Sequence, residues 1–77
     1  MTLDQAQTNT QLQVTTLDAN AQVQEKLRAM GFGPGRLLSL IQKYPGRPLL
    51  VGFYGTHARV GLGLELAQCI QVQVMTS

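Results

Sequence analysis

The side chains that could act as nucleophile, proton carrier or metal ligand are few and lie far apart in this sequence. It contains one histidine, His57, and one cysteine, Cys69. Neither has a second histidine or cysteine at a spacing typical of zinc ligands, such as H-x₃₋₅-H or C-x₂-C. His57 and Cys69 are therefore weak candidates for a metal site. We interpret His57 as a surface side chain and Cys69 as a small buried apolar one.

Groups of residues that could carry out catalysis are also missing. The four carboxylates stand apart in the sequence, which does not favour an acid–base pair. We find no nucleophile with a base and an orienting partner, either of the Ser/His/Asp or of the Cys/His kind. The sequence therefore predicts no enzymatic activity.

A glycine-rich run, RAMGFGPGR at residues 28–36, raises the question of a phosphate-binding loop. Such a loop follows a strand and precedes a helix, because the helix N-terminus must face the anion. Here the preceding pattern is helical, and neither G-x-G-x-x-G nor G-x-x-x-x-G-K-[ST] occurs. We therefore interpret Gly31 as the left-handed residue that ends a helix, with Phe32 folding back onto Leu27. Pro34 and Gly35 then occupy the centre of a type II turn.

The elements that must position these residues follow from hydrophobic periodicity and turn residues. In chain order we expect a strand at 12–17, a helix at 19–30, a hairpin of two strands at 36–44 and 48–54, a strand at 57–62, a short helix at 63–69 and a strand at 70–75. Val23, Leu27 and Met30 form the apolar stripe of the first helix. The short helix is expected to turn Leu64 and Ala67 inward, and the last strand to turn Ile70, Val72 and Val74 inward. The predicted fold is therefore mainly β: a small five-stranded antiparallel barrel with one α-helix after strand 1 and a short corner helix before the last strand.

The composition is that of one small globular domain. The chain has 77 residues, of which 44% are hydrophobic and 13% charged, and its net charge is +2. We expect a polar, partly ordered N-terminal segment at 1–10, anchored by Leu3 and Ala6, and a domain at 11–77. The sequence has a single cysteine, shows no signal-peptide pattern, and has no apolar run near the roughly 20 residues of a membrane span. We therefore expect a cytoplasmic protein.

The hairpin at 36–54 is apolar on both faces. Leu38, Leu40, Leu49, Val51 and Phe53 are expected on one face, and Leu37, Ile41, Leu50 and Tyr54 on the other. A strand of a small barrel needs only one apolar face, so something must cover the second. We favour the chain's own helix as the cover for most of it. The alternative is an exposed partner-binding patch whose anchors are Tyr44, Arg47, Leu50 and Tyr54.

Most of the chain resembles a known family, over roughly residues 12 to 75. The helix end and turn carry the resemblance through Leu27, Met30, Gly31, Phe32, Pro34 and Gly35, followed by Gly46 and Pro48 and then Ala67, Ile70 and Val72. This pattern is similar to that of the ferrous iron transport protein A family, FeoA. The resemblance implies an SH3-like β-barrel with added helices.

The same resemblance implies a function without catalysis. It implies a cytosolic accessory protein that docks on the cytosolic part of the FeoB Fe(II) transporter, which carries a GTPase domain, and modulates it. The protein would then be cytoplasmic and reach the inner membrane only through the transporter. No cofactor is implied, and we expect Fe(II) to bind at most weakly or transiently. The sequence does not decide whether the protein also self-associates through the partner-binding patch of the hairpin.

An alternative function is a small SH3-like barrel that binds a transition metal ion, a peptide or nucleic acid as a sensor or regulatory module. Nucleic acid is not expected, because its binding needs a basic stripe with stacking aromatic residues. Only Lys43, Tyr44 and Arg47 approach that pattern.

Overall fold

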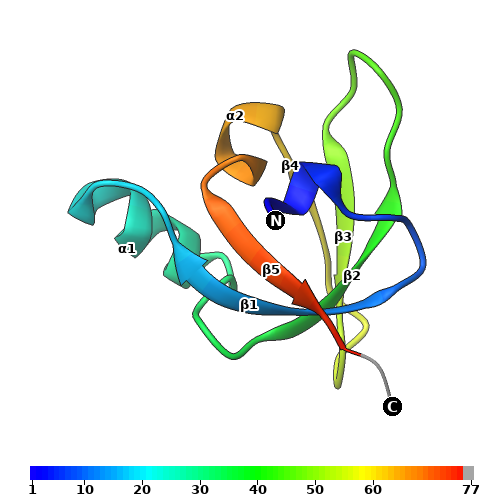
Figure 1. The fold of residues 1–77 in the computed structure, drawn as a ribbon, viewed down its shortest axis with the longest axis horizontal. Helices are drawn as coiled ribbons and strands as arrows, with labels where there is room; N and C mark the ends of the chain where they lie inside the picture. The colour runs from blue at the N-terminus through cyan, green and yellow to red at the C-terminus, as the bar shows by residue number, and fades with distance from the viewer. Residues whose placement is uncertain (76–77) are drawn as a thin grey trace.

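The computed structural model describes residues 1–75, which form five strands, two α-helices and a short 3₁₀ helix (Figure 1). In chain order these are η1 (Leu3–Gln5), β1 (Gln11–Leu17), α1 (Ala21–Ala29), β2 (Leu37–Gln42), β3 (Leu49–Phe53), β4 (Arg59–Leu62), α2 (Leu64–Ala67) and β5 (Ile70–Val74). The order of strands and α-helices predicted from the sequence is confirmed, although most elements are a few residues shorter. Residues 76 and 77, the end of the predicted domain 11–77, lie outside the described residues.

The five strands form one antiparallel sheet in the order β4-β3-β2-β1-β5. The pairing Leu38↔Phe53 and Leu40↔Val51 places inward side chains of β2 and β3 opposite one another. The outer edge of β5 is occupied by the N-terminus, because the Val72 N–H donates to the Met1 carbonyl at 2.8 Å. Within residues 1–75 no pairing joins β4 to β5, so the structure supports a single five-stranded sheet and closure into a barrel stays a prediction.

The hydrophobic core lies on the concave side of this sheet and draws on nearly every element. Its buried members are Leu3, Ala6, Leu12, Val14, Leu17, Leu27, Phe32, Leu38, Leu40, Leu49, Val51, Phe53, Leu62, Ala67, Ile70 and Val72. Leu3 and Ala6, the expected anchors of the N-terminal segment, are fully buried.

Both ends of α1 are closed by local hydrogen bonds. The Asn20 side chain accepts a hydrogen bond from the Val23 N–H at 2.9 Å, which makes Asn20 the N-cap. At the other end the Phe32 N–H donates to the Leu27 carbonyl at 2.9 Å, and Gly31 has a φ of 103°. This is the predicted Schellman cap.

The glycine-rich run continues as the predicted turn. The Arg36 N–H donates to the Gly33 carbonyl at 3.1 Å, and Gly35 has a φ of 91°, as the third position of a type II turn requires. The run therefore ends a helix and reverses the chain, and it does not present a helix N-terminus to an anion.

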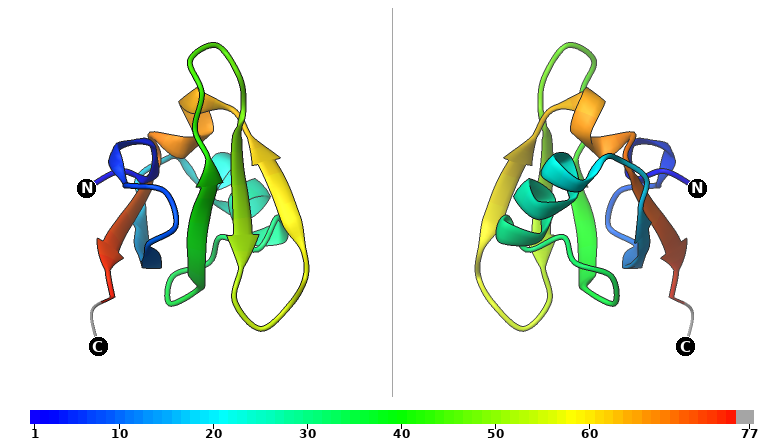
Figure 2. Two further views of the ribbon diagram at one scale, coloured as in Figure 1. Left: turned by 90° about the vertical axis from the view of Figure 1, so that its right-hand side faces the viewer. Right: turned by 90° about the vertical axis from the view of Figure 1, so that its left-hand side faces the viewer.

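The helix α1 packs against the buried face of the hairpin. Leu27 is fully buried in the same cluster as Leu38 and Phe53, whose side chains point inward. Figure 2 shows α1 on one side of β2, β3 and β4, with no helix over the other side. The expectation that α1 covers the second face is therefore wrong. That outer face stays partly exposed, with Leu37 and Ile41 half-buried.

Three other expected orientations are also wrong. Leu64 is 54% exposed, because α2 is a single turn that directs Leu66 and Ala67 inward instead. Val74 is 44% exposed at the end of the edge strand β5. Cys69 is only half-buried, and its thiol donates a hydrogen bond to the Glu65 carbonyl at 3.5 Å.

We predict that Gly31→Ala lowers the free energy of unfolding by about 1–2 kcal/mol, because a side chain disfavours the left-handed conformation. The added Cβ would also lie 3.2 Å from Cζ of Phe53. Gly33→Ala is the matched control, since Gly33 has no positive φ and no atom within 4 Å of an added Cβ. Urea unfolding of the two variants measures the difference. Equal free energies of unfolding for Gly31→Ala and Gly33→Ala would contradict the role of Gly31 as the helix cap.

Candidate partner-binding site

A groove opens at one end of the sheet, between the β2–β3 loop and the start of α2. This loop groove has a volume of about 560 Å³ and is lined by Lys43, Tyr44, Pro45, Gly46, Arg47, Pro48, Leu49, Gly63 and Leu64. The loop extends beyond the sheet at the end where α2 lies (Figures 1 and 2). Two prolines and the positive φ of Gly46 restrict the backbone of this loop.

Two large apolar side chains in the loop groove are exposed to solvent. Tyr44 is 55% exposed and Leu64 is 54% exposed. The other exposed large apolar side chains among residues 1–75, namely Met1, Tyr54 and Val74, are each less exposed than these two. Exposed aromatic and aliphatic groups around one hollow are typical of a surface that binds a protein partner.

The groove also carries positive charge. Lys43 has a structural role, because its Nζ donates to the carbonyls of Asp4 at 3.0 Å and Ala6 at 3.2 Å and so ties the N-terminal segment to the hairpin. The exposed Arg47 guanidinium takes part in no hydrogen bond that the described residues form with one another. Arg47 is therefore available to a partner, next to the apolar pair.

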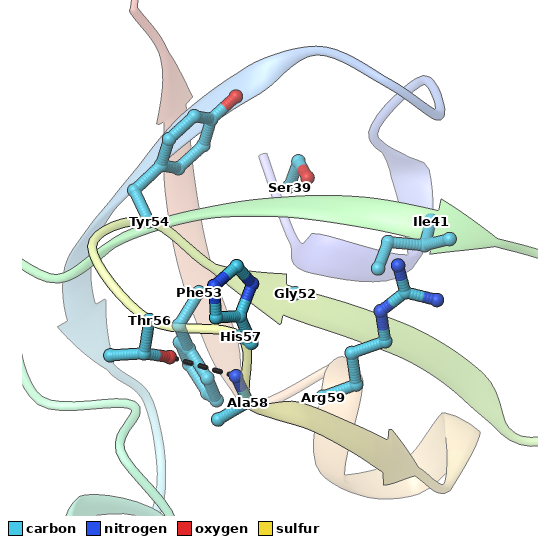
Figure 3. Close-up of a pocket in the computed structure, with 9 residues that line it drawn as sticks. All are labelled: Ser39, Ile41, Gly52, Phe53, Tyr54, Thr56, His57, Ala58 and Arg59. Carbon is cyan, nitrogen blue, oxygen red and sulfur yellow. Dashed lines mark hydrogen bonds between the residues drawn. The ribbon is translucent and has the colours of Figure 1, made fainter.

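A second, smaller depression lies on the outer face of the sheet near the opposite end of β3. This outer hollow has a volume of about 280 Å³ and is lined by Ser39, Ile41, Gly52, Phe53, Tyr54, Thr56, His57, Ala58 and Arg59. In Figure 3 the side chains of Tyr54, His57 and Arg59 surround the hollow, while Phe53 points away from it. The Thr56 hydroxyl accepts a hydrogen bond from the Ala58 N–H at 2.9 Å, which shapes the β3–β4 turn.

The four partner-binding residues predicted from the sequence fall in three places. Tyr44 and Arg47 both line the loop groove. Leu50 is half-buried on the outer face, and Tyr54 lines the outer hollow, 47% exposed. The structure brings the first two together and separates them from Tyr54 by the length of β3. The sequence does not indicate Leu64 as a binding residue, because an apolar residue in a short helix is typical of the core.

The two weak metal candidates do not meet. His57 is exposed in the β3–β4 turn, whereas Cys69 follows α2, and Figure 2 shows that turn and α2 at opposite ends of the molecule. In the described part of the chain, no three side chains of His, Cys, Asp or Glu are grouped so that they could hold a metal ion. No helix within residues 1–75 is long and apolar enough to cross a membrane.

The sheet order, the cap and the short helix before β5 together define a mainly β, SH3-like fold. One solved structure of that fold is a FeoA described as an iron uptake regulatory protein, with a TM-score of 0.87, 20% identity and 97% of each chain covered. Another is FeoA of Stenotrophomonas maltophilia, described as a prokaryotic SH3 domain protein and solved with zinc. It has a TM-score of 0.77 and 31% identity over 95% of this chain and 89% of that chain.

The chain belongs to the FeoA domain family, whose family model matches residues 1–74. Iron(II) transport protein A from Clostridium thermocellum is a further similar structure, with a TM-score of 0.84 and 27% identity over 96% of this chain and 45% of that chain. A search of curated proteins found no match. The family is associated with ferrous iron transport and not with an enzymatic activity.

We predict that Tyr44→Ser and Leu64→Ser each change the free energy of unfolding by less than about 1 kcal/mol, because these side chains bury little surface. Leu62→Ala is the contrasting variant. Leu62 is 1% exposed, so its truncation should cost about 2–5 kcal/mol. Urea unfolding compares the three. A large decrease in the free energy of unfolding of Tyr44→Ser or Leu64→Ser would mean that these groove residues stabilise the fold.

Proposed function

We propose that the protein is a non-enzymatic cytoplasmic accessory of ferrous iron uptake, which docks through its loop groove on the cytosolic part of the FeoB transporter. Membership of the FeoA family supports the link to iron transport. The single observation that carries the docking site is the exposure of Tyr44 and Leu64 around one groove. Arg47 adds a positive charge at the rim of that groove.

The groove has the features of a protein-binding site. An aromatic ring and a leucine side chain can enclose an apolar anchor of the partner, and burying such an anchor yields roughly 1.5–3 kcal/mol. The arginine at the rim can pair with a carboxylate and fix the orientation of the partner. The restricted loop loses little conformational freedom on binding, which favours affinity.

Docking would modulate transport by selecting one state of the transporter. An effector shifts an equilibrium only when it binds one state better than the other. The chain then needs no catalytic group and no resident cofactor, and Fe(II) would contact it at most weakly or transiently. Tyr54 and Leu50 remain predicted anchors of a wider contact along the outer face.

We predict that Tyr44→Asp and Leu64→Asp each weaken binding to the cytosolic region of FeoB by tenfold or more, because a carboxylate in the groove would be desolvated without a partner. Isothermal titration calorimetry of the purified proteins measures the affinity. Tyr54→Asp in the same assay tests whether the contact extends to the other end of β3.

The matched control is Val74→Asp, which introduces the same charge at an exposed apolar residue outside the groove. Its affinity should equal that of the unmodified protein. If Val74→Asp weakens binding as much as the groove variants, the loop groove is not the docking site.

A further inference from the structure

We infer that the outer hollow is a binding site for the phosphate group of a small aromatic phosphate ester. The site lies near the far end of β3 from the loop groove and shares only Tyr54 with the wider docking contact considered above. The inference rests on the shape of the hollow, the donors that surround it and the exposed ring at its wall (Figure 3).

The shape arises from a glycine at the centre of three paired strands. Ser39 of β2 pairs with Gly52 of β3, and Gly52 pairs with Arg59 of β4, so the three residues lie side by side on the outer face. Neighbouring strands are about 4.8 Å apart, which separates the Cα atoms of Ser39 and Arg59 by roughly 10 Å. Gly52 places no side chain in this gap. The two flanking residues, Ser39 and Arg59, both line the hollow.

The side chain of Ile41 occupies the space directly above Gly52. A Cβ on residue 52 would lie only 2.7 Å from Cδ1 of Ile41, so this side chain reaches over the glycine. The hollow therefore has an apolar floor at this point, formed by the Ile41 methyl group that covers Gly52. Figure 3 shows Arg59 extending toward the Ile41 end and His57 projecting over the middle.

The groups around the hollow are hydrogen-bond donors, and no carboxylate lines it. Arg59 offers a planar set of N–H groups, His57 an imidazole N–H, and Ser39 and Tyr54 one hydroxyl each. None of these side chains takes part in a hydrogen bond that residues 1–75 form with one another. A phosphate group has more acceptor oxygens than a carboxylate and matches this number of donors better.

The organic part of the ligand is indicated by Tyr54. Its side chain is 47% exposed and stands at the edge of the hollow, so its ring can stack on a planar group. The volume of about 280 Å³ suits a small ligand. A nucleoside monophosphate has both chemical parts, a phosphate group and an aromatic base.

The experiment is an NMR titration of the isotope-labelled full chain with adenosine monophosphate, inorganic phosphate and adenosine as separate probes. We expect saturable shifts at Gly52, His57 and Arg59 with the monophosphate, weaker saturable shifts at the same residues with inorganic phosphate, and none with adenosine. Absence of saturable shifts with both phosphate probes would overturn the site. Equal affinity for monophosphate and inorganic phosphate would overturn the stacking role of Tyr54.

Variants separate a specific site from general attraction of anions by a basic chain. Arg59→Gln should weaken monophosphate binding by about tenfold or more, whereas Arg47→Gln, which removes an equal charge at the loop groove, should leave it unchanged. Gly52→Ala changes the floor of the hollow without changing charge, because its Cβ takes the space that Cδ1 of Ile41 occupies. It should weaken binding as well, with the amide spectrum reporting that the fold is kept. Equal losses in Arg59→Gln and Arg47→Gln would show attraction by net charge alone and overturn the proposal.

Discussion

The packing around the Phe53 ring determines where the other parts of the molecule can lie. The Phe32 ring meets it edge-on, with centroids 5.1 Å apart, and the Arg36 guanidinium carbon lies 4.7 Å from its centroid. Gly31 approaches the same ring so closely that a Cβ would make a tight contact. The Nε atom of Arg36 is buried without a hydrogen-bond partner within the described residues, and the guanidinium lies against the face of the Phe53 ring.

These contacts decide which face of the sheet is free for function. Because Gly31 and Phe32 directly follow α1, their contact with Phe53 holds the helix on the buried side of β2 and β3. No helix therefore packs over the outer face of β2 and β3, and the β2–β3 loop extends past the sheet without a helix over it (Figure 2). Both proposed binding sites lie on parts of the hairpin strands that α1 leaves open.

The sequence predicts the local features of this fold well, because they depend on neighbouring residues. The residue after a helix end and the third residue of a type II turn both need a positive φ, which glycine adopts at low cost, and the cap and turn were both confirmed. Periodicity identified the strands but not the layer that α1 joins, since an apolar stripe can pack on either face of a hairpin. The site was predicted only in part. Tyr44 and Arg47 share a groove, but its other wall is Leu64, and contact between residues so distant in sequence depends on the tertiary fold.

The central claim is that the loop groove is the surface by which this FeoA domain meets the transporter. The most direct measurement is chemical-shift mapping of the unmodified, isotope-labelled chain in complex with the cytosolic region of FeoB. We expect the largest shifts and lost signals to cluster at residues 43–49 and 63–64, the two sides of the groove. A complex whose largest shifts lie on the exposed side of α1, with the groove unchanged, would contradict it.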